Sequence, residues 1–365
     1  MCNKYKDIVI SVLFVLILSL FFILNVFKSD VSVSLSERRK LTLMPKFSLK
    51  TLFNGTYFNE FDKYTTDQFI YRDNFRTLKA KMDLSIKNSY HNLYIKDNNF
   101  IEMEYPLNMD SVDNLINKIS YIKDNYLSKS NVYYSIIPDK NYFIDDKYLK
   151  IDYKYLENYM HDKLNFRYIG LFDDLELDDY YKTDSHFMIN KIDKVALRLL
   201  SGMNNDFDSN YEVINVGTFD GIYKSRIPIS IKSDDLNIIK NDAINNSLVY
   251  DYVKNSYIDF YDKSKLKGND KYEMYLGGST PLVKIYNNDT DNDRELIIFR
   301  DSFGSSLAPL LVSSYKTITL VDTRYISPKI LDNYIVFDNK DVLFIYSTSI
   351  INNSYSLKWH CITFL

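Results

Sequence analysis

Three short apolar runs near the C-terminus constrain the fold of this chain more than any other feature. They are LIIF at 296–299, ITLV at 318–321 and VLFIY at 342–346, each bounded by polar or turn residues. Short continuous apolar runs of this kind are typical of strands that are buried on both faces. Earlier segments alternate similarly, with strand patterns at 132–137 and 168–171 and helical patterns at 116–128, 153–163 and 190–203. The chain is therefore predicted to be an α/β protein with a mostly parallel sheet covered by helices on both faces.

Other segments add smaller elements to this sheet. Residues 92–103, NLYIKDNNFIEM, predict a β-hairpin with its turn at 96–99. Apolar residues at helical spacing predict one amphipathic helix over 55–76, packed on the main body. Residues 205–275 are richer in polar residues and predict an insertion or an antiparallel patch.

The N-terminus carries a run long enough to cross a membrane as a helix. From Ile8 to Phe27 there are 20 residues, interrupted only by Ser11, Ser19 and Asn25. No small-residue cleavage site follows, which favours an uncleaved anchor over a cleaved signal peptide. A short tail before a long body favours a body on the extracytoplasmic side of the membrane. The predicted organisation is a tail and transmembrane anchor over 1–30, a juxtamembrane segment and helix over 31–80, and a catalytic domain over 81–365.

Composition argues against several classes of function. The chain has 45 basic and 48 acidic residues and a formal net charge of −3, so it lacks the basic surface that nucleic-acid binding requires. Cys2 and Cys361 lie at opposite ends, which argues against a disulfide between them. No CxxC or Cys/His cluster is present, so we expect no metal and no cofactor.

The segment ELIIFRDSFGSSLAPLL, 295–311, is the first candidate for chemistry. A buried strand ends at Arg300, a sharp turn follows, and an apolar helix begins at about Ser305. Ser302 would then lie at the carboxyl edge of the sheet and at a helix N-terminus, where free amides stabilise developing negative charge. Two interpretations are open, because Ser302 could be a nucleophile or merely a helix cap.

The segment YYKTDSHFMIN, 180–190, is the second candidate. In an extended loop, Asp184 and His186 lie on the same side, so the carboxylate could orient the imidazole as a general base. A surface histidine and two ligands of a metal site are the alternatives, although no further ligands with suitable spacing occur nearby.

Two further motifs could contribute to a site at this edge. YEMYLGGSTPL, 272–282, contains Gly277 and Gly278, which could expose amides for an oxyanion hole or form an ordinary hairpin turn. VDTRY, 321–325, would place Arg324 at the same edge. Arg324 could bind a polar substrate group or be a structural partner of Asp322 or Asp301.

Together these motifs resemble the DHHW family of the SGNH-hydrolase-like superfamily, relatives of the alginate O-acetylation proteins. The resemblance is carried, in the family's order, by SERRKLTLMPKFS at 36–48, FDKYTTDQFIYRDNFR at 61–76, YYKTDSHF at 180–187, YEMYLGGSTPL at 272–282, FRDSFGSSLAPLL at 299–311 and VDTRY at 321–325. This chain departs from the family's name motif, because Ser185 stands at the place of the extra histidine and Phe187 at that of the tryptophan.

The resemblance implies a flavodoxin-like SGNH fold in permuted order, with Ser302 as nucleophile, His186 as base and Asp184 as orienting acid. It implies that Gly278 and the Ser302 amide donate to the oxyanion, with Gly277, Arg324 and Asp301 beside the substrate. The implied function is an O-acetyltransferase that acts on an exopolysaccharide or cell-wall glycan, with a multi-pass membrane protein exporting the acetyl group. An acetyl esterase of the same fold and a non-catalytic glycan-binding or assembly protein are the alternatives.

Overall fold

The structure is a computed structural model that describes residues 2–358, so Cys361 lies outside the described residues. The chain divides into two compact units, one made of residues 1–91 and 224–230 and the other of residues 92–223 and 231–365. The boundaries predicted at 30 and 80 stay predictions.

The α-helices are Cys2–Phe27 (α1), Leu49–Phe53 (α2), Thr56–Asp67 (α3), Arg72–Lys87 (α4), Met109–Tyr126 (α5), Tyr153–Lys163 (α6), Asp193–Gly202 (α7), Tyr223–Arg226 (α8), Asp242–Asn245 (α9), Phe303–Leu311 (α10) and Thr348–Asn352 (α11). The strands are Val33–Ser34 (β1), Arg39–Lys40 (β2), Leu93–Lys96 (β3), Asn99–Glu102 (β4), Asn131–Ile137 (β5), Arg167–Tyr168 (β6), Glu212–Phe219 (β7), Asp234–Lys240 (β8), Leu248–Asp251 (β9), Ser256–Ile258 (β10), Leu282–Tyr286 (β11), Glu295–Arg300 (β12), Thr317–Val321 (β13) and Asp341–Ser347 (β14).

The first unit begins with the apolar helix predicted from the sequence. Within the described residues, the stretch Lys4–Phe27 of α1 is long and apolar enough to cross a membrane, with a mean hydropathy of 2.9 over its most apolar window. Its side chains are exposed to the surroundings, as those of a helix in contact with lipid would be.

The single helix predicted over 55–76 is wrong, because the structure has two helices, α3 and α4, in this region. The chain leaves α3 at Gln68, whose side-chain amide bonds the backbone of Val31 and Thr42. The Ile70 amide donates to the side-chain oxygen of Asn25 at 2.8 Å, and Tyr71 adopts a left-handed φ of 55°. Partners outside the helix thus replace intrahelical hydrogen bonds at the break.

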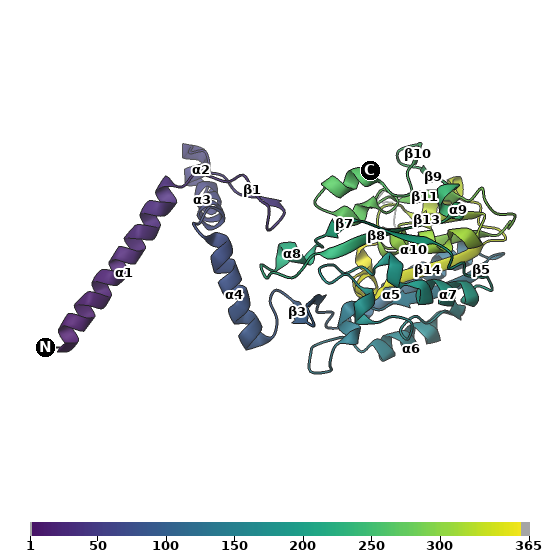
Figure 1. The fold of residues 1–365 in the computed structure, drawn as a ribbon, viewed down its shortest axis with the longest axis horizontal. Coiled ribbons are helices and arrows are strands. Elements are labelled where there is room, and N and C mark those ends of the chain that lie inside the picture. Colours follow the sequence, from purple (N-terminus) through teal and green to yellow (C-terminus); the bar gives the residue numbers. More distant parts are fainter. Residues whose placement is uncertain (1, 359–365) are drawn as a thin grey trace. The chain divides into compact units, whose positions relative to one another are not determined.

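The second unit is built on one eight-stranded sheet with the order β10-β9-β11-β13-β12-β14-β5-β6 (Figure 1). Five strands, β13, β12, β14, β5 and β6, are parallel to one another. The antiparallel strand β11 pairs with β13, and β9 and β10 extend the sheet beyond it in antiparallel pairs. The predicted mostly parallel sheet is confirmed. The polar region 205–275 supplies the antiparallel β7–β8 ribbon and strands β9 and β10, and the predicted hairpin is β3–β4.

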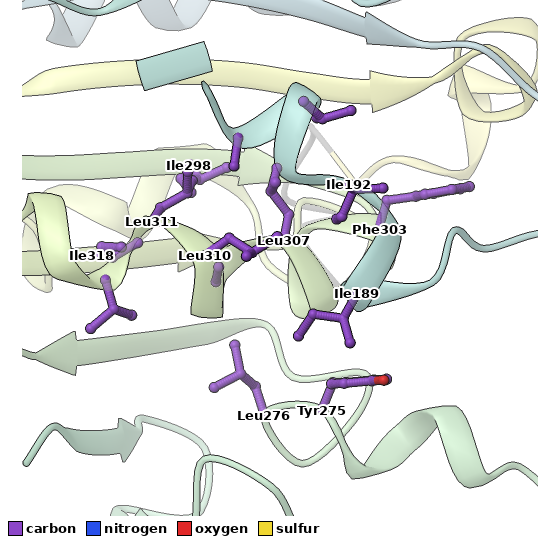
Figure 2. Packing of buried hydrophobic residues seen from close by; sticks show 14 of the residues in the cluster. Ile189, Ile192, Tyr275, Leu276, Ile298, Phe303, Leu307, Leu310, Leu311 and Ile318 are labelled. Carbon is purple, nitrogen blue, oxygen red and sulfur yellow. The ribbon is translucent and has the colours of Figure 1, made fainter. Parts of the chain in front are cut away.

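Alternating side chains of the central strands supply two hydrophobic cores. On β12, Leu296 and Ile298 point into a core with residues of α7 and α10, whereas Ile297 and Phe299 point into a core with residues of α5 and α6. A strand whose two faces are both buried reads as an uninterrupted apolar run, which explains the sequence pattern. Figure 2 shows Leu307, Leu310 and Leu311 of α10 among the residues of the first core.

Sheet topology fixes where a site can form. From β12 the chain crosses to β13 on one side, and from β13 it returns to β14 on the other side of β12. The carboxyl ends of β12 and β14 therefore border a switch point, which is where open α/β sheets bind ligands.

Candidate active site

The turn after β12 is fixed to the end of β14 by Asp301. One carboxylate oxygen of Asp301 accepts from the amide of Phe303 at 3.0 Å, and the other accepts from the amide of Ser347 at 2.8 Å. The side chain is almost fully buried. Asp301 therefore holds the start of α10 against β14 and sets the position of Ser302 between them.

Ser302, His186 and Asp184 form a continuous hydrogen-bonded chain. His186 Nε2 lies 2.7 Å from Ser302 Oγ, and His186 Nδ1 lies 2.6 Å from Asp184 Oδ1. The Ser302 side chain makes no capping hydrogen bond to α10, so its hydroxyl is directed to the imidazole instead. When Nδ1 donates to the carboxylate, Nε2 is left to accept the serine proton.

Asp184 is buried and holds its charge through hydrogen bonds. Burial acts to raise its pKa, but the hydrogen bond and charge of His186 and the amides of Ile222 and His186 outweigh burial, so the pKa is about 2. The Ile222 amide donates to Oδ2 at 2.9 Å. Asp184 is thus ionised at neutral pH, as a carboxylate that orients an imidazole has to be.

Two aromatic rings pack against the imidazole. The ring of Tyr272 is stacked on His186, with centroids 3.8 Å apart and an interplanar angle of 14°, and the ring of Phe303 lies 4.8 Å away. At the place of the tryptophan of the family's name motif stands Phe187. Phe187 is buried and packs on Phe303 with centroids at 4.9 Å.

A buried lysine holds the loop that carries Asp184. Lys140, just after β5, donates from Nζ to the carbonyls of Tyr181, Lys182 and Asp184 at 2.7, 3.3 and 3.2 Å. Burial lowers the pKa of this lysine to about 7, against the raising effect of Asp234 and Asp184. Asp234 completes the anchoring, because it accepts from the amides of Lys182 and Thr183 at 2.7 and 2.9 Å.

A cavity of about 160 Å³ opens beside the serine. Its lining includes Ser302, Ser185, Arg324, Glu102 and Glu104. Burial is the largest effect on Glu104 and raises its pKa to about 7, with a further contribution from the charge of Asp139. The cavity therefore combines a serine hydroxyl, a guanidinium and a carboxyl group whose pKa is raised to about 7.

Arg324 faces this cavity and is also a partner of Asp322. Its Nε and Nη2 donate to the two carboxylate oxygens of Asp322 at 2.9 and 2.7 Å. Asp322 also lies 3.4 Å from the buried guanidinium of Arg300. Arg324 is therefore a structural partner of Asp322, and its guanidinium also lines the cavity, where it could bind a polar substrate group.

The glycine pair adopts the conformation that favours glycine, with φ of 70° at Gly277 and 85° at Gly278. However, the Gly278 amide donates to the Tyr275 carbonyl at 3.1 Å, within a tight turn. Neither glycine is among the residues that line the Ser302 cavity. The structure therefore brings Ser302, His186, Asp184, Asp301 and Arg324 together and leaves the glycine pair outside that group.

Sequence reasoning missed Tyr272, Lys140 and Glu104. Tyr272 lies in a motif that was singled out for its glycines, and Lys140 follows a predicted strand at the edge where ligands bind. A charged residue three positions after a buried strand was therefore an available signal for Lys140. Glu104 gave no such signal, because only the tertiary structure brings β4 beside the turn after β12.

Fold and element order define this chain as an SGNH-hydrolase-like α/β protein, in which the aspartate and histidine precede the serine. Residues 37–147 match the family model described as DHHW protein, which confirms the resemblance seen in the motifs. The matched range includes Lys140 but ends before Asp184, His186 and Ser302. No protein of curated function matches this chain.

Two solved structures with TM-scores above 0.5 share the fold. A DHHW family protein from Eubacterium siraeum is 21% identical, with 72% of this chain and 92% of that chain covered and a TM-score of 0.58. Bacillus cereus PatB1 with a sulfonyl adduct is 17% identical, with 71% and 97% covered and a TM-score of 0.55. The O-acetyltransferase domain of Pseudomonas putida AlgJ is 11% identical, with 75% and 95% covered and a TM-score of 0.46.

Proposed function

We propose that this chain is a serine acyl-transfer enzyme that moves an acetyl group through an ester on Ser302. The observation that carries the proposal is the pair of short contacts from His186, 2.7 Å to the Ser302 hydroxyl and 2.6 Å to the Asp184 carboxylate. A nucleophile, a base and an orienting carboxylate in hydrogen-bond reach are what nucleophilic catalysis at an ester requires.

In the first step, Ser302 Oγ attacks the acetyl carbonyl while its proton passes to His186 Nε2. The bond to the donor's oxygen then breaks, and the donor oxygen takes the proton from His186 as it leaves. In the second step, His186 removes a proton from an acceptor hydroxyl, which attacks the acetyl-serine. The new ester leaves, and the same proton returns to Ser302.

The negative oxygen formed in both steps needs fixed donors. In the described residues, the Ser302 amide has no hydrogen-bond partner, and it lies at the N-terminus of α10. This amide is the first donor we assign. The Gly278 amide predicted as second donor is engaged with Tyr275, so we expect it to contribute only if that turn opens.

We further propose that the acceptor is a hydroxyl of an extracytoplasmic glycan. The apolar helix α1 would anchor the chain in a membrane with the second unit on the outer side, where exopolysaccharide and wall polymers lie. An acetyl donor must then be delivered across the membrane, which calls for a multi-pass acetyl-exporting partner. If water replaces the acceptor, the same site acts as an acetyl esterase.

The test uses the full-length chain in detergent micelles, with p-nitrophenyl acetate as donor and a sulfonyl fluoride as active-site reagent. A solved relative of the same fold carries a sulfonyl adduct, which supports this choice of reagent. Wild-type protein should release p-nitrophenol and gain one sulfonyl group by mass spectrometry. Ser302→Ala should lose labelling, and its turnover should fall about 10³-fold or more.

Ser305→Ala is the matched control, because this serine lies one turn along α10, whereas the hydroxyl bonded to the imidazole is that of Ser302. Its turnover and labelling should resemble those of the wild type. Full turnover in Ser302→Ala would overturn the proposal in favour of another nucleophile. Adding oligosaccharide acceptors then separates the activities, because a transferase gives acetylated sugar and an esterase gives acetate alone.

A further inference from the structure

A second cavity, of about 630 Å³, lies beside β6. It is bounded by residues of α6, of α7, of β6 and of the loop that follows β6, and it shares no lining residue with the cavity of Ser302. Its volume is within the range of small-molecule sites and is sufficient for one or two sugar rings. Nothing in the proposed acyl transfer uses this cavity.

Fixed aromatic rings form part of its wall. Tyr142 packs edge-to-face on Tyr153 and Phe172, with centroids 5.1 and 4.9 Å apart. Tyr168 packs on Tyr134 at 4.8 Å, and its hydroxyl donates to Glu157 at 2.7 Å. Rings held in this way need no ordering when a ligand arrives, and aromatic faces pack well on the C–H faces of sugars.

The charges around this cavity balance. Its charged lining residues are three basic and three acidic side chains: Lys154, Arg167, Arg198, Glu157, Asp173 and Asp174. Arg198 donates to Asp174 at 2.7 Å, which fixes both groups. An anionic or phosphorylated ligand would call for an excess of basic groups. Balanced, hydrogen-bonding charges beside aromatic rings instead suit a neutral ligand with many hydroxyl groups.

Tyr153 connects the two cavities. Its hydroxyl donates to the carboxylate of Asp139, with both oxygens at 2.9 Å, and Asp139 lines the cavity of Ser302. β5 and β6 are parallel neighbours, so the loops that follow them leave the sheet at the same edge. A chain of sugars lying along this edge would therefore pass from one cavity to the other.

We propose that the β6 cavity binds a neutral sugar unit of the acceptor glycan, while another unit of the same glycan receives the acetyl group at Ser302. This proposal rests on the proposed function, because it takes the acceptor to be a glycan. The cavity would give the enzyme affinity for polymers over free sugars, since the second contact acts at high effective concentration.

The test measures retention of full-length protein on an array of neutral, anionic and phosphorylated polysaccharides. Ser201→Trp places a large side chain in the cavity from an exposed position on the last turn of α7. Lys194→Trp is the matched control, because it adds the same side chain to an exposed position of the same helix outside the cavity. Arg198→Ala is a second, smaller change at an exposed lining residue.

Neutral polysaccharides should retain the wild type, Lys194→Trp and Ser302→Ala. Retention should fall about tenfold in Ser201→Trp and severalfold in Arg198→Ala. Hydrolysis of p-nitrophenyl acetate should be unchanged in both cavity variants. Retention only on charged polymers, no retention at all, or undiminished retention of both cavity variants would overturn the proposal. Failure of the acyl-transfer proposal would be seen in a different measurement: the wild type would show no hydrolysis of p-nitrophenyl acetate that depends on Ser302.

Discussion

The imidazole of His186 lies flat on the phenol ring of Tyr272, with ring centroids 3.8 Å apart. The same tyrosine donates from its hydroxyl to the carbonyl of Ser302 at 3.2 Å and contacts the hydroxyl of Ser306 at 2.7 Å. One side chain therefore contacts the proposed base and the backbone of the proposed nucleophile. We therefore expect Tyr272 to act as a positioning residue that sets the distance between them.

Replacing this ring should lower turnover more than substrate affinity. In Tyr272→Leu, the imidazole loses its stacking partner, and kcat for p-nitrophenyl acetate should fall about 10- to 100-fold, because misplacement of a catalytic group by about 1 Å costs this much. Tyr272→Phe keeps the ring and loses both contacts of the hydroxyl. Of these, the hydrogen bond to the Ser302 carbonyl bears on the site and is worth about 1 kcal/mol, so kcat should fall only about fivefold.

Steady-state kinetics check this difference, with KM expected to stay within about threefold of the wild type in both variants. Equal losses in Tyr272→Leu and Tyr272→Phe would show that the hydroxyl, and not the stacked ring, positions the site. An unchanged kcat in Tyr272→Leu would remove the tyrosine from the account altogether.

The carboxylate of Asp184 should control which nitrogen of His186 carries the proton. In Asp184→Asn, the amide group can donate to Nδ1, which forces the proton onto Nε2 and prevents Nε2 from accepting the serine proton. We expect kcat to fall about 10³- to 10⁴-fold, as removal of the orienting charge does in serine enzymes with this arrangement. Sulfonyl labelling of Ser302 should slow in parallel. Turnover within tenfold of the wild type would be incompatible with Asp184 as the orienting acid.

Much of the fold could be predicted because buried parallel strands leave a direct mark on the sequence. Ile297, Ile298 and their neighbours on β12 are apolar on both faces, and the strand was predicted within one residue at each end. The break around Gln68 could not be predicted, because the Gln68 side chain bonds the backbone of Val31 and Thr42 and the Ile70 amide donates to the side chain of Asn25. Helical periodicity records which face is apolar, but it carries no information on distant hydrogen-bond partners.

In the candidate site, too, residues within local sequence motifs could be predicted, and residues that reach it through tertiary packing could not. Ser302 and the pair Asp184 and His186 were predicted from local patterns, since a serine after a buried strand and a D-x-H loop carry their chemistry in adjacent residues. The ring of Tyr272 and the side chain of Glu104 reach the site only through tertiary packing. Gly277 and Gly278 were chosen for their backbone freedom, but the sequence could not indicate that one of their amides is engaged with Tyr275.

Gly221 should be essential for the position of Asp184. A Cβ atom built on Gly221 would lie 2.3 Å from the carbonyl oxygen of Thr183 and 2.4 Å from Cβ of Asp184. Because one of these neighbours is backbone, the loop must shift. Gly221→Ala should therefore destabilise the fold by about 1–3 kcal/mol and lower turnover about 10- to 100-fold.

Gly170→Ala is the control for this change, because the added Cβ meets only the Tyr168 ring at an ordinary 3.5 Å. Its thermal midpoint and its turnover should match the wild type. Circular dichroism melts and p-nitrophenyl acetate kinetics on the two variants make the comparison. Wild-type turnover in Gly221→Ala would mean that the loop of Asp184 tolerates displacement, against the geometry of the site.

Glu104 should make stability depend on pH in the opposite direction to Asp184. Burial raises its pKa from the ordinary 4.5 to about 7. Between these values the folded chain keeps a proton that the unfolded chain has released, so the free energy of unfolding falls as the pH rises. A shift of this size corresponds to a loss of up to about 3 kcal/mol. Asp184 acts at lower pH, where its stabilising contribution is lost as the pH falls from about 4 toward 2.

Glu104→Gln removes the titrating proton and keeps a side chain of similar shape, so the variant should lack this loss of stability. Melting midpoints of wild type and variant should be similar at pH 4.5 and should diverge up to pH 8, with the variant more stable at the upper end. Glu212→Gln, at an exposed position on β7, should follow the wild type at every pH. The wild type and Glu104→Gln share every other carboxylate, so a pH-dependent difference between their melting midpoints comes from Glu104. A difference that stays constant from pH 4.5 to 8 would show that the carboxyl group at 104 ionises as it does in water.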